Sequence, residues 1–353
     1  MKILIAYGSK GKFFHLKEFG EALQKLGVEY KLVKDTDYCR GFPSKNIKDW
    51  FIGRKSFKKL IKDYNPDVIF VDRQNIFGVE SIKTKIPTFV LLRGHFWQEQ
   101  IWAKKTIYKK PLMRLVLWLR NKIAEKCFEN ATAIFPICEY LIDIIKIHHP
   151  KQNTHVFFEG IDKSKWHHCD GMELKHPCVG LLQDANWWGK TKEMLVLKKV
   201  LKELPEINFY WAGDGPYREK IIAELDEFEN FNWIGRLEYP DKVRDFLSNI
   251  DIYALITGMD LAPLTLKEAQ LMEKPVIATD VGGVKEMMVN EKTGFLVREN
   301  HPEDIIEKIK FFIKNQEKAM EMGKNGSIFI DETFNWNKIA ENFLTIIEKH
   351  YIK

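Results

Sequence analysis

Short apolar runs alternate with longer amphipathic stretches along almost all of the 353-residue chain. The short runs are rich in β-branched and aromatic residues and are bounded by turn-forming residues, which predicts strands. The longer stretches repeat their apolar residues with helical period. Together they predict an α/β fold in which parallel sheets are covered by helices on both faces. The predicted strands are Ile3–Ala6, Val68–Asp72, Thr88–Leu92, Ala133–Pro136, His155–Phe158, Val179–Leu182, Asn208–Trp211, Asn232–Ile234, Ile252–Leu255, Val276–Ala278 and Phe295–Val297.

One predicted helix has a clear apolar stripe between the strands at 88–92 and 133–136. Its apolar residues recur at helical spacing, so we expect them to form one buried face. They are Leu112, Leu115, Val116, Leu119 and Ile123.

The length of the chain predicts two domains, because single hydrophobic cores stop growing at about 250–300 residues. The mixed polar stretch 160–177 interrupts the alternation, and we place the boundary there. The expected domains are residues 1–163 and 164–334. Ligands bind beyond the carboxyl ends of parallel strands, so we expect two facing sheets to form a site in the cleft between them.

Composition fits an ordinary globular protein, with 45% hydrophobic and 29% charged residues. No apolar run approaches the roughly 18–20 residues of a membrane span, and Met1–Tyr7 reads as a first strand rather than a secretory signal. Five scattered cysteines without a Cys-x-x-Cys pair indicate reduced thiols, and we expect a cytoplasmic protein. The net charge of +6 permits an anionic partner, but the 49 acidic residues mixed in do not indicate nucleic acid.

The segment 258–286 is the richest in chemistry. Thr265-x-x-Glu268 is a capping-box pattern, which predicts that Thr265 caps a helix whose first amides face the site. A helix N-terminus beyond a strand suits a diphosphate. Asp260 and Glu268 are placed to accept hydrogen bonds from ligand hydroxyls. The alternative is that Glu268 only completes the capping box and Asp260 only solvates a loop.

This segment resembles the signature of the retaining glycosyltransferase family 4. In that family two acidic residues separated by seven others precede Pro-Val-Ile-Ala and Gly-Gly-x-x-Glu. Here Asp260 stands where the family usually has glutamate and Glu268 is in register, and they are followed by Lys274–Ala278 and Gly282–Glu286.

Weaker matches follow the order of the family along nearly the whole chain. Phe158–Asp162 resembles an interdomain Asn-Gly-Ile-Asp turn, and Ala212–Pro216 resembles a Gly-Asp-Gly-Pro loop. Gly235-Arg236 resembles a Gly-x turn, and Gly8–Gly11 resembles a glycine loop after the first strand. The resemblance implies the GT-B fold, with two Rossmann-like domains and a final helix of about 335–353 that returns to the first domain.

The resemblance also implies roles for individual residues. Glu268 would bind the donor ribose, Asp260 would contact the transferred sugar, and Lys190 would neutralise the departing diphosphate. Backbone amides of Leu264 and Thr265, after Pro263, would hold the diphosphate. The other donor-binding positions implied by these motifs are Gly8, Gly11, Gly213, Gly215, Gly235 and Arg236.

Three departures from the family pattern stand out. Asp260 is shorter than the usual glutamate, and Leu181, Gln183 and Asp184 occupy the neighbourhood of an expected basic residue. The position of the family's N-domain histidine falls on Arg93, with His95 two residues later. Arg93 would be a phosphate clamp, and His95 would be a hydrogen-bond partner of the sugar or a structural histidine.

The implied reaction transfers a hexose from a nucleotide diphosphate donor to a glycan or lipid-linked acceptor, with retention and without a metal or other cofactor. Relief of negative charge on the departing phosphate oxygen would supply much of the catalysis. Two alternatives remain: a nucleotide-sugar epimerase of the same fold, and a non-catalytic nucleotide-sugar-binding protein.

Two other motifs are weak. Trp188–Thr191 ends like a Walker A loop, but Asp184 stands at its first glycine. His167-His168-Cys169 with His176-x-Cys178 has metal-ligand residue types at irregular spacing, which gives little support to a zinc site.

The region Phe96–Cys127 combines tryptophan with many basic residues. This composition is typical of contact with an anionic membrane surface, and it would suit a lipid-linked acceptor. A helix with a buried apolar stripe and a solvated basic face explains the same residues.

Overall fold

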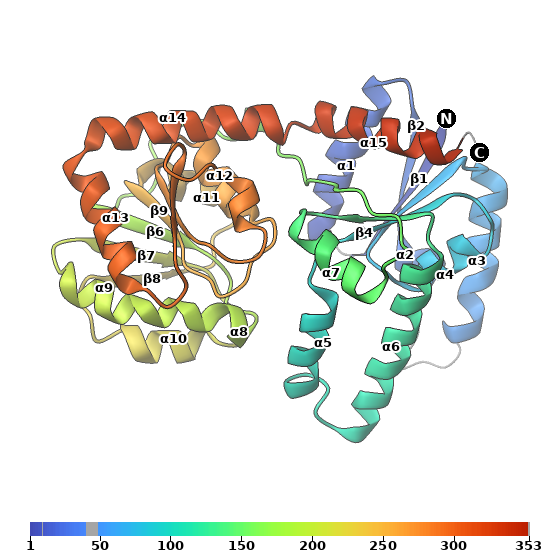
Figure 1. Ribbon diagram of the computed structural model, residues 1–353, viewed down its shortest axis with the longest axis horizontal. Coiled ribbons are helices and arrows are strands. Elements are labelled where there is room, and N and C mark those ends of the chain that lie inside the picture. Colours follow the sequence, from blue (N-terminus) through green and yellow to red (C-terminus); the bar gives the residue numbers. More distant parts are fainter. Residues whose placement is uncertain (9, 40–48, 352–353) are drawn as a thin grey trace. The chain divides into compact units, whose positions relative to one another are not determined.

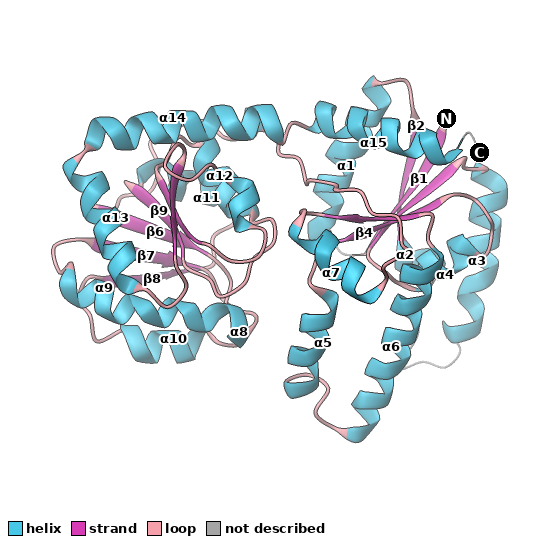
Figure 2. Ribbon diagram, in the orientation of Figure 1, coloured by secondary structure: helices cyan, strands magenta, loops and turns pink. Residues whose placement is uncertain are grey.

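The computed structural model describes residues 1–8, 10–39 and 49–351, and it forms two compact domains (Figure 1). The first domain comprises Met1–Gly160 together with Phe334–Lys353, and the second comprises Ile161–Thr333. The sequence predicted the domain boundary after residue 163 and the return of the chain to the first domain near residue 335. Both domains are parallel sheets with helices on both faces, which confirms the predicted α/β class (Figure 2).

The first domain has a five-stranded sheet in the order β2-β1-β3-β4-β5. Every pairing in it is parallel. Its strands are β1 (Lys2–Tyr7), β2 (Glu29–Lys34), β3 (Val68–Asp72), β4 (Thr88–Leu92) and β5 (Ala133–Pro136). Its helices are α1 (Lys10–Lys25), α2 (Asp35–Tyr38), α3 (Asp49–Tyr64), α4 (Ile76–Ile82), α5 (Phe96–Lys105), α6 (Pro111–Asn130), α7 (Tyr140–His148) and α15 (Trp336–Tyr351).

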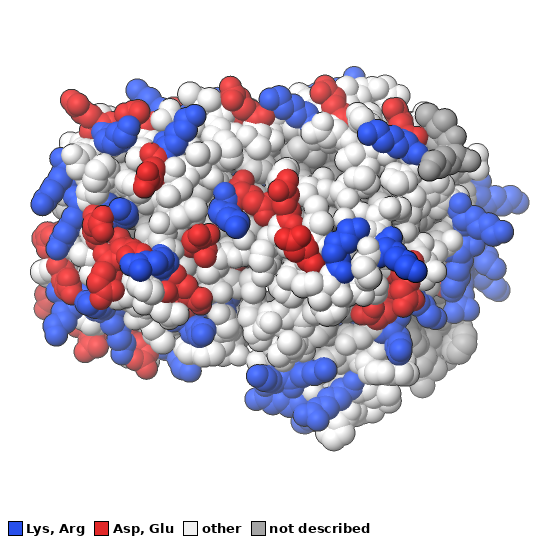
Figure 3. All heavy atoms as spheres, viewed as in Figure 1, with Lys and Arg blue, Asp and Glu red and all other residues white. Residues whose placement is uncertain are grey.

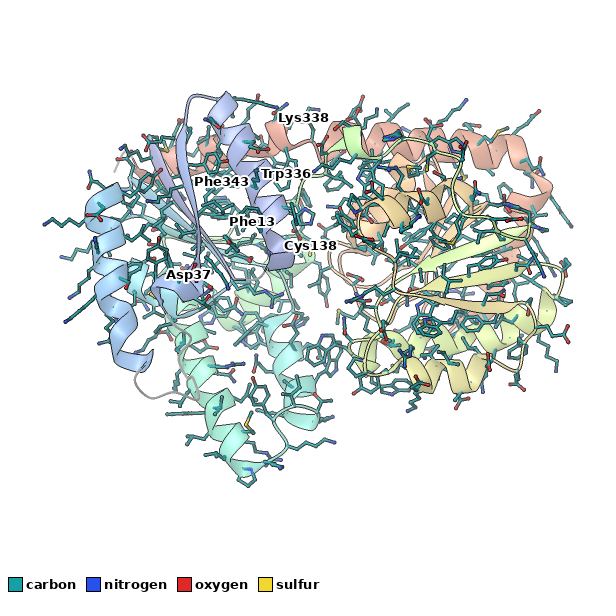
Figure 4. All side chains as sticks on the ribbon, turned by 180° about the vertical axis from the view of Figure 1, so that it is seen from behind. Phe13, Asp37, Cys138, Trp336, Lys338 and Phe343 are labelled. Carbon is teal, nitrogen blue, oxygen red and sulfur yellow. The ribbon has the colours of Figure 1, made fainter. Side chains whose placement is uncertain are left out.

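The C-terminal helix α15 completes the core of the first domain. The Phe343 ring packs edge-on against Phe19 of α1 and Phe70 of β3, with ring centroids 5.1 and 5.0 Å away. At the start of the helix, Trp336 lies so close to Gly160 that a Cβ there would come within 2.3 Å of the indole. Figure 4 shows Phe343 and Trp336 on this helix beside α1. Aromatic burial of this kind is a large contribution to a core.

The second domain has a six-stranded parallel sheet in the order β11-β10-β9-β6-β7-β8. Its strands are β6 (Cys178–Leu182), β7 (Asn208–Ala212), β8 (Phe231–Gly235), β9 (Ile252–Leu255), β10 (Val276–Thr279) and β11 (Gly294–Val297). Its α-helices are α8 (Trp188–Thr191), α9 (Leu197–Glu203), α10 (Arg218–Leu225), α11 (Asp241–Asn249), α12 (Leu264–Leu271), α13 (Pro302–Lys314) and α14 (Gln316–Thr333). Short 3₁₀ turns are η1 (Lys163–Lys165), η2 (Lys192–Val196) and η3 (Val284–Met287).

The strand order reverses direction at β6 and β9, which are neighbours although β7 and β8 lie between them in sequence. At such a switch point the loops beyond the two strands diverge and leave room for a ligand. The loops that follow β6 and β9 carry Lys190 and Asp260.

One predicted strand of the first domain was wrong, and one strand was missed. The predicted strand His155–Phe158 is instead an extended segment outside the sheet. It contacts β5 through the isolated bridge between Thr154 and Ile134 and through a hydrogen bond from the Phe157 amide to the Pro136 carbonyl at 2.8 Å. Conversely, β2 was not predicted. It lies at the edge of the sheet, and only Val33 in it is buried, so the apolar run that marks an inner strand is missing.

The predicted buried stripe of α6 was also wrong in its first half. Leu112 and Leu115 are 72% and 52% exposed, whereas Leu117 and Ile123 are buried. Helical spacing alone did not reveal which face of the helix is covered. Among the described residues, no helix is both long and apolar enough to cross a membrane.

Candidate functional site

Lys190 and Asp260 meet at the carboxyl edge of the second sheet. Lys190 lies in α8, beyond β6, and Asp260 lies in the loop after β9. The Lys190 ammonium donates a hydrogen bond to Asp260 Oδ2 in an ion pair, and the side chains are 28% and 16% exposed. The sequence predicted both residues separately as site residues, and the structure brings them together.

Glycines hold the backbone on either side of this pair. The Gly258 amide donates to the Lys190 carbonyl at 2.9 Å, and a Cβ on Gly258 would lie 2.7 Å from the Gly189 carbonyl oxygen. The Gly283 amide donates to the Asp260 carbonyl at 3.0 Å. Gly282 has φ +56°, and a Cβ there would lie 2.2 Å from the same carbonyl oxygen. The Gly-Gly pair therefore fixes the position of Asp260.

Glu268 lies in the helix that follows the loop of Asp260, and it is almost completely buried. It belongs to α12, is 1% exposed, and its Oε1 atom has no hydrogen-bond partner among the described residues. Burial raises the pKa of Glu268 to about 8, while a hydrogen bond from Tyr239 and the charge of Lys267 oppose the rise. A buried acceptor without a partner is costly for folding, which is a reason to expect a ligand hydroxyl there.

The predicted capping box is wrong. The residue before α12 is Pro263, whose φ of −62° and ψ of 114° begin the helix without any side-chain cap. Thr265 is the second residue of the helix, and its hydroxyl accepts a hydrogen bond from Tyr253 at 2.7 Å. Tyr253 is fully buried in β9, so Thr265 ties the helix to the sheet.

The start of α12 nevertheless offers the backbone amides that the sequence predicted for binding a diphosphate. The first amides of a helix, here those of Leu264 and Thr265, have no partner within it and carry partial positive charge. They follow Pro263 in the same loop that carries Asp260. An anion at this point would therefore meet backbone donors close to the sheet edge.

The loops after β7 and β8 form a second group at the same edge. Gly213 cannot carry a side chain, because its Cβ would lie 2.0 Å from the Gln183 carbonyl oxygen, and Gly215 has φ +145°. These glycines allow the ends of neighbouring strands to approach closely. Gly235 has φ +79° with open space around it.

Arg236 supplies a basic side chain near Asp184, where the sequence lacks the basic residue that the family pattern has. Arg236 Nη2 donates to Asp184 Oδ2 at 2.7 Å, and Asp184 follows β6 in the neighbourhood where the family pattern has a basic residue. The Arg236 side chain is 65% exposed, so its remaining donors face solvent. Arg236 therefore brings positive charge to the end of β6 from the end of β8.

In the first domain, Arg93 is buried and forms ion pairs with residues of the same domain. Its guanidinium forms ion pairs with Asp72 at the end of β3 and with Glu159, and the three side chains are 2%, 2% and 10% exposed. Both carboxylates raise the pKa of Arg93 against the effect of burial. The structure gives the predicted phosphate clamp two internal partners instead of a free guanidinium.

His95 begins α5 as its N-cap residue. Its Nδ1 accepts a hydrogen bond from the Gln98 amide at 3.3 Å, and burial lowers its pKa. The imidazole therefore has a structural function beside the predicted contact with a sugar.

The predicted glycine loop is shorter than expected. Gly8 immediately follows β1, and a Cβ there would lie 3.4 Å from Asp35 Oδ2. Gly11 is already in the first turn of α1, and Ser9 lies outside the described residues.

Comparison with known proteins identifies the segment that holds this site. Residues 189–328 match the family described as glycosyl transferases group 1. They include Lys190, Asp260, Glu268 and the glycines that position them. Family 4 is consistent with this match.

Curated relatives extend the likeness. The chain is 31% identical over 171 residues to trehalose synthase of Thermococcus litoralis, covering 46% of this chain and 41% of that protein. It is 24% identical over 353 residues to N,N'-diacetylbacillosaminyl-diphospho-undecaprenol alpha-1,3-N-acetylgalactosaminyltransferase of Campylobacter jejuni, covering 94% of this chain and 89% of that protein. The chain spans about two fifths of the length of the first curated relatives it matches.

Solved structures show that the fold is GT-B. Sucrose-phosphate synthase from Thermosynechococcus elongatus matches with a TM-score of 0.76 and 15% identity, covering 100% of this chain and 99% of that one. Anabaena HepE in complex with UDP-glucose matches with a TM-score of 0.70 and 15% identity, covering 99% of this chain and 100% of that one. At these identities the likeness concerns the fold alone.

Proposed function

We propose that the protein is a retaining hexosyltransferase of glycosyltransferase family 4. It moves a sugar from a nucleotide diphosphate donor to a glycan or lipid-linked acceptor. The observation that carries this proposal is the Lys190–Asp260 ion pair together with the buried Glu268, in the segment that matches the group 1 family. The names of its relatives support transfer to such acceptors, and HepE was solved with a nucleotide sugar.

Each predicted site residue of the second domain then has one function. Glu268 accepts the ribose hydroxyls, which would satisfy its unpartnered Oε1. The amides of Leu264 and Thr265 bind the diphosphate, and Arg236 with the glycines of the β7 and β8 loops borders the nucleoside. Asp260 orients the sugar, and Lys190 neutralises the charge that builds on the departing oxygen. No step requires a metal.

The acceptor is assigned to the first domain. The resemblance to the family assigns Gly8 and Gly11 to donor binding and His95 to contact with the sugar. The acceptor hydroxyl attacks the anomeric carbon on the face from which the diphosphate departs. Its proton passes to the departing phosphate oxygen, and the bond from that oxygen to the sugar breaks. Positioning of the two substrates supplies the rest of the rate.

We further propose that the hairpin of α5 and α6 rests on an anionic membrane at the cytoplasmic face. Its outer residues are apolar and exposed, which is unusual for a surface that meets only water. They are Ile101, Ile107, Leu112, Leu115 and Trp118, which are 48–72% exposed. We call these five residues the hairpin patch.

Basic residues alternate along the chain with the residues of the hairpin patch. Figure 3 shows them gathered over the lower ends of α5 and α6. They include Lys104, Lys105, Lys109, Lys110, Arg114 and Lys122. Exposed apolar residues within a basic surface complement a bilayer with anionic headgroups. A lipid-linked acceptor would be held at the same surface.

Nucleotide binding and transfer test the enzyme proposal. UDP, GDP, ADP and their common sugar conjugates are tested by thermal shift on the wild type, on Glu268→Gln and on Glu307→Ala, an exposed glutamate on α13. At a hundred times Kd a ligand stabilises by about 2.7 kcal/mol. We expect one nucleotide class to stabilise the wild type and Glu307→Ala but not Glu268→Gln.

A turnover assay distinguishes an active enzyme from a non-catalytic binding protein. With the donor so identified, we expect Lys190→Ala to lower transfer by about 10²–10³-fold and the exposed Lys192→Ala to leave it unchanged. Binding without turnover in any acceptor extract would favour the non-catalytic alternative. Conversion of the donor without an acceptor would favour the epimerase.

A further inference from the structure

A second group of chemically reactive side chains lies at the opposite edge of the second sheet. Cys178 is the first residue of β6, His176 lies two residues before it, and Asp251 immediately precedes β9. β6 and β9 are parallel neighbours paired through Val179 and Ile252, so they begin at the same amino edge. Lys190 and Asp260 follow the carboxyl ends of these two strands, so the two groups are separate.

The three side chains converge on one point. One ligand atom from each lies within 4.8 Å of the others. His176 Nδ1 lies 2.8 Å from Asp251 Oδ2 and 3.8 Å from Cys178 Sγ. Tetrahedral zinc with ordinary bond lengths separates its nitrogen and oxygen ligands by about 3.3 Å and its nitrogen and sulfur ligands by about 3.6 Å. Both separations in the structure differ from these values by no more than about half an ångström.

The backbone holds the group in place. The Cys178 amide donates to Asp251 Oδ2 at 2.7 Å, and the Asp251 amide donates to the Cys178 carbonyl at 3.3 Å. Cys178 is buried, whereas the His176 and Asp251 side chains are 49% and 40% exposed. An ion bound here would therefore have protein on one side and solvent on the other, where a water molecule completes the coordination.

We propose that His176, Cys178 and Asp251 bind a single zinc ion, or another divalent cation that favours sulfur and nitrogen ligands. One thiolate, one imidazole and one carboxylate suit zinc and not Mg²⁺ or Ca²⁺, which take oxygen ligands. The thiol proton passes to solvent on binding. The ion joins the amino ends of two adjacent strands, so its function is structural and independent of sugar transfer.

Two features of the surroundings affect binding. Burial, with the charge of Asp251, raises the pKa of the Cys178 thiol to about 12, so the ion must compete with a firmly held proton. The Lys274 ammonium lowers that pKa from nearby, where its Nζ donates to the Ser248 carbonyl at 2.7 Å. The weak sequence pattern 167–178 contained two of the three ligands. Asp251 was not predicted because it is 73 residues from Cys178.

The test uses full-length protein without a histidine tag, stripped with a chelator. Calorimetric titration with zinc chloride should show one ion per chain, and Co²⁺ should produce the near-ultraviolet absorption of a thiolate–cobalt bond. Cys178→Ser should abolish that absorption and weaken zinc binding at least about tenfold. His176→Gln changes a half-exposed side chain and should weaken zinc binding similarly, so it serves if Cys178→Ser fails to fold.

Cys169→Ser is the matched control. This part-buried thiol of the same domain lies 3.1 Å from Ser248 Oγ and outside the proposed ligand set. It should keep both the stoichiometry and the cobalt absorption. Equal zinc binding by the wild type, Cys178→Ser and His176→Gln would overturn the proposal, as would a wild type that takes up no zinc.

Discussion

The Lys190 ammonium and the Asp260 carboxylate neutralise each other at the carboxyl edge of the second sheet. In the proposed reaction each of them has a different partner: the lysine meets the diphosphate and the aspartate meets the sugar. Binding of the donor would therefore exchange this internal ion pair for two contacts with the ligand. The pair is partly screened from solvent, so its loss is compensated only by a ligand that supplies both partners.

Removing the charge of Asp260 separates binding from turnover. We expect Asp260→Asn to bind the nucleoside diphosphate about threefold more tightly or better, because Lys190 is released and a like charge is removed from the phosphates. Transfer should fall by about 10²-fold or more, because the sugar loses its carboxylate. Calorimetry gives Kd and a transfer assay gives kcat.

The control for this prediction is Asp260→Glu. The longer carboxylate is the residue that the family usually has, so it should retain transfer within about tenfold of the wild type. Parallel loss of binding and transfer in Asp260→Asn would instead indicate that the ion pair only holds the loop.

Glu268 should make the stability of the free protein depend on pH. Burial raises the pKa of Glu268 to about 8 from its ordinary value of 4.5. Between these values the folded protein holds a proton that the unfolded chain has released, so the stability contributed by this group falls as pH rises. Glutamine has no such proton. Melting temperatures without ligand should therefore shift in favour of Glu268→Gln as pH rises from about 5 to 8.

A difference between the two melting temperatures that stays constant over this range would contradict the prediction. Glu307→Ala, at an exposed site, should follow the wild type at each pH.

Arg93 should matter for folding more than for donor binding. Arg93→Met leaves the carboxylates of Asp72 and Glu159 without their cation, and loss of one partner from a buried pair costs about 3–5 kcal/mol. The urea midpoint of unfolding should fall accordingly. Arg54→Met, at a side chain that is 62% exposed, should change it little. If Arg93→Met left stability unchanged but weakened donor binding, Arg93 would be a phosphate clamp as the sequence predicted.

The hairpin patch should control membrane binding. Leu112→Glu with Trp118→Glu adds negative charge at two exposed apolar positions and should abolish sedimentation with vesicles that contain phosphatidylglycerol. Ile328→Glu changes an equally exposed residue of α14 and should not. Binding should weaken with salt and be poor on phosphatidylcholine alone. A wild type that ignores anionic vesicles would contradict the proposal.

The sequence predicted most strands because inner parallel strands are continuous apolar runs. Val68–Asp72, Thr88–Leu92, Ala133–Pro136 and Ile252–Leu255 have the predicted bounds, and in each every residue is buried. The edge strand Glu29–Lys34 alternates polar and apolar residues, which weakens that signal.

The sequence predicted which residues belong to the site but not which of them contact each other. Motif spacing singled out Lys190, Asp260 and Glu268, but the ion pair joins residues 70 positions apart. The capping box failed because Pro263 already starts the helix, and no local pattern shows that the Thr265 hydroxyl bonds to Tyr253. The partners of Arg93 were hidden for the same reason, since Glu159 is 66 residues away.

The packing of α15 has a consequence for biosynthesis. The second domain is one continuous segment, whereas the first takes Phe343 and Trp336 from the far side of it in sequence. On the ribosome the second domain is therefore complete before the first has received its final helix. Until then the aromatic rings around Phe19 and Phe70 lack part of their cover, and the growing chain presents them to chaperones or to other unfinished chains.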